Sequence, residues 1–114
     1  MLKTLISYVE FPSQDVAASK DFYGSLFKWS FEDFGPNYAA FSEAGVEGGF
    51  NGGSEDRTKA PLVVLETEDL ESMFEKVKAA GGAITFPIFS YPGGRRFHFT
   101  DPSGNELAVM QKQS

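Results

Sequence analysis

The chain has 114 residues, enough for one domain that buries a core without covalent cross-links. Ten basic residues against sixteen acidic ones give a formal net charge of −6 at pH 7, which disfavours binding to nucleic acid or to an anionic membrane surface. The absence of cysteine excludes a disulfide framework, a thiolate zinc site and a cysteine nucleophile. It is the composition expected of a cytoplasmic protein.

The first half of the chain is predicted to form one strand, one helix and three short strands. A β-rich run over 5–11 is followed by a helix over 15–28, where Asp15 is a good N-cap. Five apolar residues are predicted to fall near one face of this helix: Val16, Phe22, Tyr23, Leu26 and Phe27. Runs of β-forming residues separated by Gly, Pro and Asn then predict strands over 30–34, 38–42 and 46–50.

The second half repeats this order. A strand is predicted over 62–67 and a helix over 69–80, with Asp69 as its N-cap and Gly81-Gly82 as its end. The apolar stripe of this helix has the i, i+3, i+4, i+7 spacing, in Leu70, Met73, Phe74 and Val77. Strands are predicted over 83–87, 95–100 and 106–111.

The strand, turn and capping aspartate of 8–15 recur in 62–69, so the chain is interpreted as two similar modules. The modules span about 1–53 and 60–114, and the polar segment 51–60 is the predicted linker. The expected fold is α+β: two βαβββ modules that form a cupped mixed sheet with both helices on the outer face.

The chain resembles the vicinal oxygen chelate superfamily, which is the glyoxalase, bleomycin-resistance and dioxygenase group. The resemblance covers nearly the whole chain and rests on Tyr8-Val9-Glu10-Phe11, Asp15-Val16, Phe22-Tyr23-Gly24, Leu26-Phe27-Lys28-Trp29, Asp69-Leu70, Gly81-Gly82 and the run from Phe99 to Ala108. It implies a homodimer, and it implies either a glyoxalase-like lyase, isomerase or dioxygenase activity or the sequestration of a small ligand.

Catalytic members of this group hold one divalent metal ion in the cup. The resemblance places the usual ligand positions at Tyr8, Leu62, Gly48 or Gly49, and Ala108. Leucine, glycine and alanine side chains carry no donor atom, and tyrosine is a weak choice for these metals. The usual metal site is therefore predicted to be absent, and no cofactor is expected.

A shifted metal site is the alternative. Alternate residues of a strand share a face, so Tyr8 brings Glu10 into the cup and Ala108 brings Glu106 with it. If Phe97 and Phe99 face the helix, Arg96 and His98 face the cup. Glu10, His98 and Glu106 are thus the candidate ligands of one divalent ion in a rebuilt site.

Nine residues are the candidate ligand-binding set. His98, the sole histidine, and Glu10, in an apolar strand, are the candidate proton-transfer groups, and Arg96 is a candidate anchor for a carboxylate or phosphate. The set is completed by Tyr8, Phe41, Phe50, Leu62, Ala108 and Met110 as further lining. The competing interpretation is that these side chains are ordinary core residues or structural ion pairs.

The sequence is therefore interpreted as a protein that binds a small organic ligand without a metal. The alternative is a glyoxalase-like lyase, isomerase or dioxygenase with the rebuilt site. Neither a nucleic acid nor a membrane is an expected partner, whereas a second copy of the chain is.

Overall fold

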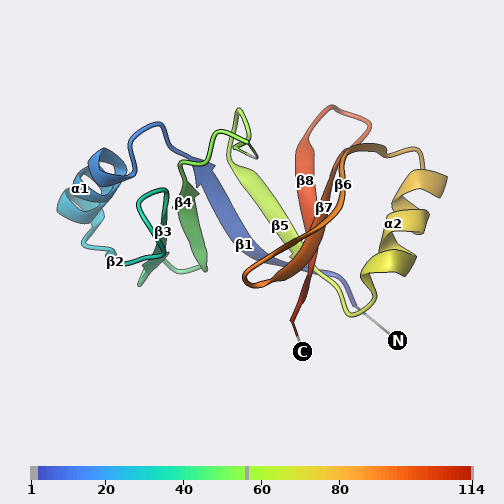
Figure 1. The fold of residues 1–114 in the computed structure, drawn as a ribbon, viewed down its shortest axis with the longest axis horizontal. Coiled ribbons are helices and arrows are strands. Elements are labelled where there is room, and N and C mark those ends of the chain that lie inside the picture. The colour runs from blue at the N-terminus through green and yellow to red at the C-terminus, as the bar shows by residue number, and fades with distance from the viewer. Residues whose placement is uncertain (1–2, 56, 114) are drawn as a thin grey trace. The chain divides into compact units, whose positions relative to one another are not determined.

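The computed structural model describes residues 3–55 and 57–113, and within them the chain forms two helices and eight strands (Figure 1). In chain order the elements are β1 (Leu5–Pro12), α1 (Val16–Phe27), β2 (Ser30–Asp33), β3 (Tyr38–Ser42), β4 (Gly48–Asn51), β5 (Leu62–Glu66), α2 (Leu70–Ala79), β6 (Ala83–Tyr91), β7 (Gly94–Thr100) and β8 (Glu106–Lys112). The predicted α+β class is confirmed, and so is the βαβββ order of each half.

The chain divides into two compact units, with the boundary after Leu62. The first unit begins at Tyr8, and its strands lie in the order β2-β3-β4-β1, with β1 and β4 parallel and the other pairs antiparallel. The second unit also contains the residues before Tyr8, and its strands lie in the order β5-β8-β7-β6, with only β5 and β8 parallel. Within the predicted linker, Arg57 donates hydrogen bonds to the carbonyl oxygens of Ser13 and Gly52.

Helix α1 begins where it was predicted, because the Asp15 carboxylate accepts a hydrogen bond from the Ala18 N–H at 3.0 Å. The helix packs on β3 and β4 over an aromatic core. Tyr23 stacks on Trp29 with ring centroids 5.3 Å apart. The buried members of this core are Val16, Ala39, Phe41 and Phe50, and Phe11, Tyr23, Trp29 and Phe31 pack against them.

The prediction that Phe41 and Phe50 line a ligand-binding surface is therefore wrong. Both rings are buried beneath α1, and both contact Phe11, at 6.0 and 5.8 Å between centroids. Side chains alternate between the two faces of a strand, so the Phe11 face of β1 is opposite to the face that carries Glu10. The two phenylalanines are core residues.

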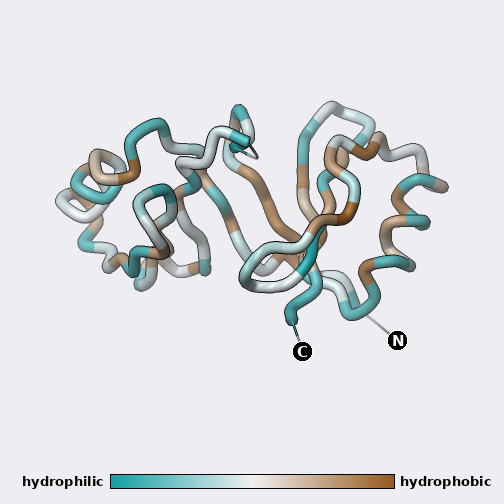
Figure 2. The backbone as a smooth tube through the Cα atoms, in the orientation of Figure 1, coloured by the Kyte–Doolittle hydropathy of each residue, from teal (hydrophilic) through white to brown (hydrophobic). Residues whose placement is uncertain are grey.

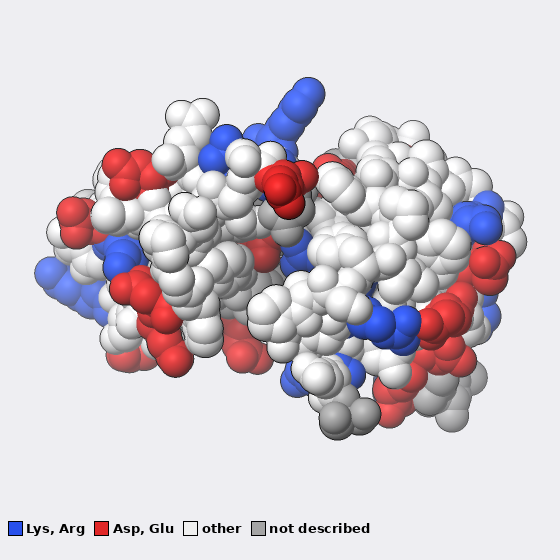
Figure 3. All heavy atoms as spheres, in the orientation of Figure 1, with Lys and Arg blue, Asp and Glu red and all other residues white. Residues whose placement is uncertain are grey.

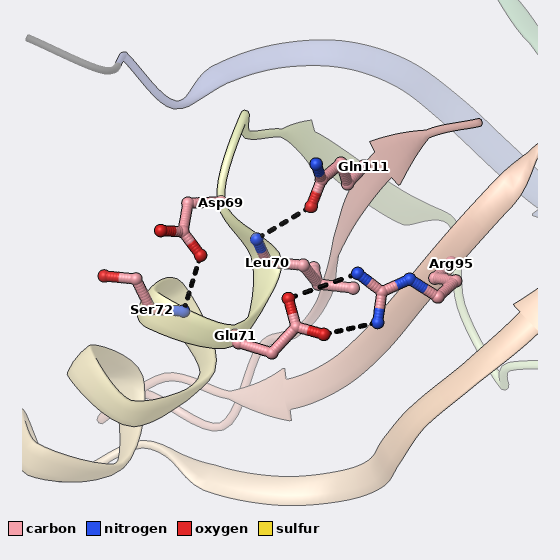
Figure 4. Close-up of polar contacts among 6 residues, drawn as sticks. All are labelled: Asp69, Leu70, Glu71, Ser72, Arg95 and Gln111. Carbon is pink, nitrogen blue, oxygen red and sulfur yellow. Dashed lines mark hydrogen bonds and ion pairs between the residues drawn. The ribbon is translucent and has the colours of Figure 1, made fainter. Parts of the chain in front are cut away.

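Helix α2 is held at its first turn by two side chains (Figure 4). The Asp69 carboxylate accepts from the Ser72 N–H, and the Gln111 side-chain oxygen accepts from the Leu70 N–H, both at 3.0 Å. The helix ends at the predicted place, where Gly81 has a φ of 97°, a conformation that favours glycine.

The core of the second unit lies between α2 and its sheet. Phe97 is fully buried and meets Phe74 of α2 edge-to-face at 5.1 Å between centroids. Phe99 packs against the same cluster, so the prediction that both phenylalanines face the helix is confirmed. Arg96 and His98 consequently lie on the opposite face of β7.

Strand β6 runs four residues beyond its predicted end, and its register against β7 shifts twice, once between Ile84 and Phe86 and once between Phe86 and Phe89. Phe86 pairs with His98 and Phe89 pairs with Arg96, so three steps along β6 correspond to two steps along β7. This β-bulge includes Pro87, which is tolerated because β6 is at the end of the strand order. The bulge turns Phe89 to the face of Arg96 and His98, whereas simple alternation from Phe86 would have turned it to the helix.

The hydrophobic residues lie where the core is, and the charged residues of both signs are mixed on the surface. Figure 2 shows β5 as a nearly continuous hydrophobic run, and its residues Leu62 and Val64 are buried. On the face drawn in Figure 3, acidic and basic groups are interspersed and no broad basic surface is visible. Within residues 3–55 and 57–113, no helix is long and apolar enough to cross a membrane.

Glu71 on α2 and Arg95 on β7 form an exposed ion pair in which two guanidinium nitrogens meet both carboxylate oxygens (Figure 4). The hydrogen bonds from Arg95 lower the pKa of Glu71 below its ordinary value of 4.5. The pair therefore stabilises the fold above that pH and loses its effect as the pH falls through the lowered pKa. We expect Glu71→Gln to reduce the melting temperature slightly at pH 7.

The difference between the wild-type protein and Glu71→Gln should shrink as the pH falls through the lowered pKa of Glu71, because the protonated carboxyl is uncharged like the glutamine. Melting temperatures measured from pH 7 to pH 3 check this. Glu75→Gln, on the same helix, is the matched control. The Glu75 carboxylate lies 3.5 Å from the Lys78 side-chain nitrogen, so its ion pair is longer than that of Glu71 with Arg95. A Glu71→Gln difference that does not shrink as the pH falls would show that the pair does not act through charge.

Candidate functional site

Each unit carries one cluster of polar side chains on the sheet face opposite its helix. The tyrosine–glutamate cluster comprises Tyr8, Glu10, Tyr38 and Asn51 of the first unit. The arginine–histidine cluster, in the second unit, comprises Arg96, His98, Glu106 and the rings of Phe86, Phe89 and Tyr91.

The tyrosine–glutamate cluster is assembled by three neighbouring strands. Tyr8 and Glu10 share a face of β1, Tyr38 begins β3, and Asn51 ends β4 opposite Tyr38 in the ladder. Glu10 is only 5% exposed. Its carboxylate accepts from the Tyr38 hydroxyl at 3.0 Å and from the Asn51 side-chain nitrogen at 3.3 Å. The hydroxyls of Tyr38 and Tyr8 lie 2.6 Å apart.

Because an ionised Glu10 only accepts hydrogen bonds, the donor of each hydrogen bond between these side chains can be assigned. Because Tyr38 donates its proton to Glu10, the hydrogen bond between the two tyrosines is donated by Tyr8. Burial, and after it the nearby charge of Glu10, raise the pKa of Tyr38 far above its ordinary value. Tyr38 therefore stays protonated across the physiological range and acts as a donor, not as a base. Asn51 is oriented by the Gly53 N–H, which donates to its side-chain oxygen at 2.8 Å.

Gly49 provides the space that the two tyrosines occupy. A Cβ atom at this position would lie 2.7 Å from the Tyr38 hydroxyl and 2.8 Å from the Tyr8 hydroxyl, closer than real Cβ contacts. We expect Gly49→Ala to displace both hydroxyls and to lower the free energy of unfolding by about 1–3 kcal/mol. Urea denaturation, with the near-ultraviolet tyrosine signal as a second readout, checks this. An unchanged stability and spectrum would show that the cluster is loosely packed.

In the arginine–histidine cluster, the His98 ring is fully buried and its Nδ1 lies 3.1 Å from Oε2 of Glu106. The same carboxylate oxygen accepts from the Thr85 hydroxyl at 3.1 Å. An ionised carboxylate only accepts hydrogen bonds, so we assign the proton of a neutral His98 ring to Nδ1. The Nε2 atom is then the acceptor nitrogen of the ring.

Three aromatic rings surround Arg96 and His98. The Arg96 guanidinium lies 5.5 Å from the Phe89 ring centroid and 5.1 Å from that of Tyr91. The His98 ring is 4.9 Å from Phe86 and 5.8 Å from Phe89. Rings at these distances attract the guanidinium through cation–π interactions, and a guanidinium presents its N–H groups as a planar fork. That geometry suits in-plane contact with a carboxylate, phosphate or enolate oxygen.

The remaining predicted site residues lie beside these groups on their own strands. Ala108 pairs with His98 and Met110 pairs with Arg96 across the β7–β8 ladder, so all four share one face. Leu62, fully buried, begins β5. Glu10 belongs to the first unit, whereas His98 and Glu106 belong to the second.

The residues at the family's usual ligand positions do not fit a divalent metal ion. Leu62 and Ala108 are buried hydrocarbon, the Tyr8 hydroxyl is engaged with Tyr38, and the space beside Gly49 is filled by tyrosine atoms. Within residues 3–55 and 57–113, no three His, Cys, Asp or Glu side chains are grouped so that they could hold a metal ion. We therefore derive no reaction step through a metal.

Sequence reasoning missed five side chains that contact the predicted ones: Tyr38, Asn51, Phe86, Phe89 and Tyr91. One signal was available for Tyr38, because it lies at odd spacing from the apolar Ala39 and Phe41 and so faces away from the core. No local signal marked Phe89, whose orientation depends on the β-bulge.

Known proteins are similar to this chain in sequence and in fold. The chain is 29% identical to the anthracycline biosynthesis protein DauV of Streptomyces sp. (strain C5), over 93% of this chain and 46% of that protein. It thus spans about half the length of the curated relatives it matches. Its fold is similar to that of a glyoxalase/bleomycin resistance protein/dioxygenase superfamily member from Vibrio splendidus 12B01. The TM-score is 0.69, with 17% identity over 99% of this chain and all of that one.

The fold is also similar to that of the Mn(II)-bound glyoxalase from Novosphingobium aromaticivorans, with a TM-score of 0.68 and 22% identity over 94% of this chain and 38% of that one. At these identities the structural likeness concerns the fold alone. The family described as the Glyoxalase/Bleomycin resistance protein/Dioxygenase superfamily matches residues 5–109. The chain therefore belongs to the glyoxalase/bleomycin resistance protein/dioxygenase superfamily.

Proposed function

We propose that this protein binds a small, oxygen-bearing aromatic ligand without the help of a metal ion. The observation that carries the proposal concerns the positions where the resemblance places metal ligands: Leu62 and Ala108 are buried hydrocarbon, and the Tyr8 hydroxyl is hydrogen-bonded to Tyr38. The similarity to an anthracycline biosynthesis protein supports a role in the chemistry or sequestration of oxygen-bearing aromatic compounds. The cysteine-free composition is the reason for placing this role in the cytoplasm.

The arginine–histidine cluster supplies the chemistry for this ligand class. Arg96 is held by two rings and offers a fixed fork for an anionic oxygen. His98, oriented by Glu106, offers one ring nitrogen to a hydroxyl or keto group. The rings of Phe86, Phe89 and Tyr91 supply apolar surface suited to a planar molecule.

An enzyme is the second candidate: a glyoxalase-like lyase, isomerase or dioxygenase that uses a divalent ion. The contact between His98 Nδ1 and Glu106 favours it, because a histidine and a carboxylate are common ligands of such ions. The binding proposal is preferred because the same contact also satisfies both groups without a metal.

A thermal-shift screen in the presence of a chelator tests the binding proposal. Hydroxylated polycyclic aromatics, hydroxybenzoates and aliphatic carboxylates of matched charge form the panel. We expect only aromatic compounds with an anionic oxygen to raise the melting temperature, since a ligand at 100 times its Kd stabilises the native state by about 2.7 kcal/mol. A flat panel would contradict the proposal.

Arg96→Gln should weaken the binding of the best compound by about ten- to hundred-fold, the loss expected for a charge-assisted hydrogen bond. Arg95→Gln is the matched control, because the neighbouring Arg95 pairs with Glu71 on the helix side of the same strand. Isothermal titration calorimetry measures both. Equal losses in the two variants would show that only the net charge matters.

A further inference from the structure

Strand β4 ends in Asn51, and Gly52 follows it, a pair of residues that is prone to spontaneous deamidation. In this reaction the Gly52 backbone nitrogen attacks the side-chain carbonyl carbon of Asn51. The new nitrogen–carbon bond closes a five-membered imide, and the bond to the side-chain nitrogen breaks. The proton that the attacking nitrogen loses is regained, through the solvent, by the departing ammonia. Water then opens the imide to aspartate or isoaspartate. Glycine favours the attack because it has no side chain to obstruct it.

The fold requires both residues of this reactive pair. The Asn51 side chain donates to the Glu10 carboxylate at 3.3 Å and accepts from the Gly53 N–H at 2.8 Å. A Cβ atom at Gly52 would lie 2.9 Å from a methyl carbon of Val16, closer than real Cβ contacts. Replacing either residue would therefore cost a buried hydrogen bond or the close packing of α1 on this strand end.

The native structure blocks the attack. The Gly52 N–H donates to the Asn37 carbonyl oxygen at 2.7 Å, so the attacking nitrogen is held in a hydrogen bond. The Asn51 residue is only 7% exposed, its side-chain amide is held at both ends, and its backbone carbonyl accepts from the Ser13 N–H at 2.9 Å. The reaction also needs water to carry the proton and to open the imide. Deamidation therefore requires the end of β4 to open locally.

Arg57 holds this strand end closed. Its guanidinium donates to the Ser13 carbonyl oxygen at 3.2 Å and to the Gly52 carbonyl oxygen at 3.4 Å. Ser13 follows β1 and Gly52 follows β4, which are parallel neighbours, so one side chain ties together the ends of two strands. Losing these bonds should make local opening more frequent. All of these residues belong to the first unit.

We propose that Asn51 is a modification site, which converts to aspartate or isoaspartate when the strand end held by Arg57 opens. The change is irreversible and disables the tyrosine–glutamate cluster. An ionised aspartate cannot donate to Glu10, and it places a second carboxylate beside a buried one. Isoaspartate also lengthens the backbone by one carbon, which displaces the pairing with Tyr38. The proposal is independent of the ligand-binding proposal, because it involves no ligand.

Peptide mass spectrometry of the full chain tests the protection by the fold. The protein is incubated at mildly alkaline pH, in buffer and in guanidinium chloride above its unfolding transition. We expect Asn51 to convert at least about tenfold more slowly in buffer, because the reaction needs local opening. Asn37 and Asn105 are internal controls: Tyr38 and Glu106 follow them, and these side chains slow the attack. Equal rates in buffer and denaturant would overturn the proposal.

Arg57→Gln tests how the strand end is held. We expect it to speed the conversion of Asn51 in buffer by at least about threefold and to leave the rate in denaturant unchanged. Lys59→Gln is the matched control, because Lys59 is an exposed cation two residues along the same segment. Circular dichroism and melting temperatures establish that each variant is folded. A rate in buffer that Arg57→Gln leaves unchanged would overturn the role given to Arg57.

Asn51→Asp reproduces one product of the modification. We expect a lower melting temperature and a changed near-ultraviolet tyrosine signal, because the donor to Glu10 is lost and a carboxylate is buried. Asn37→Asp makes the same chemical change at an exposed position, and we expect it to leave both readouts unchanged. Identical behaviour of the two variants would contradict the claim that the modification disables the tyrosine–glutamate cluster.

Discussion

Replacing Phe50 by alanine is expected to lower the free energy of unfolding by about 3–5 kcal/mol, the largest effect of any single substitution we expect. The Phe50 ring is 1% exposed, and its centroid lies 5.2 Å from that of Tyr23 and 5.6 Å from that of Phe41. Alanine would leave a cavity between α1 and its sheet, because the surrounding rings relax only in part. Urea denaturation followed by circular dichroism measures the loss.

Phe34→Ala is the control for Phe50→Ala, because it removes the same ring from a position that is 58% exposed. We expect its effect to stay within about 0.5 kcal/mol. Similar losses in the two variants would contradict the placement of Phe50 in the core.

Replacing Glu10 by alanine is expected to have the second largest effect, a loss of about 2–4 kcal/mol. The substitution removes the acceptor for the buried donors of Tyr38 and Asn51, and each buried donor left without a partner costs about 1–3 kcal/mol. The loss should be accompanied by a changed tyrosine absorption, because the Tyr38 hydroxyl changes its surroundings. Urea denaturation and near-ultraviolet spectroscopy give the two readouts.

Glu10→Gln separates the charge from the shape of this side chain. The glutamine can accept from only one of the two donors, and Asn51 cannot turn its amide because Gly53 holds the oxygen. We therefore expect Glu10→Gln to lower the free energy of unfolding, but by less than Glu10→Ala does. In a double-mutant cycle, Tyr38→Phe and Glu10→Gln should be non-additive. Additive losses would show that the 3.0 Å contact between Tyr38 and Glu10 contributes nothing to stability.

The elements themselves could be predicted from the sequence because their signals are local. Asp15 and Asp69 cap their helices as their position before an apolar stripe predicts, and Gly81 stops the second helix through a left-handed conformation. The repetition of this local pattern was sufficient to predict two βαβββ modules.

The site could be predicted only in part because its geometry is not local. Alternation assigns residues to two faces of a strand but does not say which face meets the helix, which is why Phe41 and Phe50 were assigned to the wrong one. Glu10 meets Tyr38 and Asn51 because β1, β4 and β3 are neighbours, and that order is set by pairing between distant segments. The β-bulge that brings Phe89 to Arg96 is marked in the sequence only by Pro87, which does not by itself say where the register shifts.

Membership of the superfamily fixes the fold and leaves the chemistry open, because one scaffold accepts many sites. The resemblance places metal ligands at four positions of this chain. Two of them, Leu62 and Ala108, cannot bind any metal ion.

The most direct test is the metal content of the purified protein, measured together with its melting temperature in added manganese, iron(II), nickel or zinc against a chelator. We predict far less than one metal ion per chain and the same melting temperature in every condition, since no binding means no stabilisation. A stoichiometric metal ion with a raised melting temperature, both lost in Glu10→Ala or His98→Ala, would contradict the account and identify a rebuilt metal site.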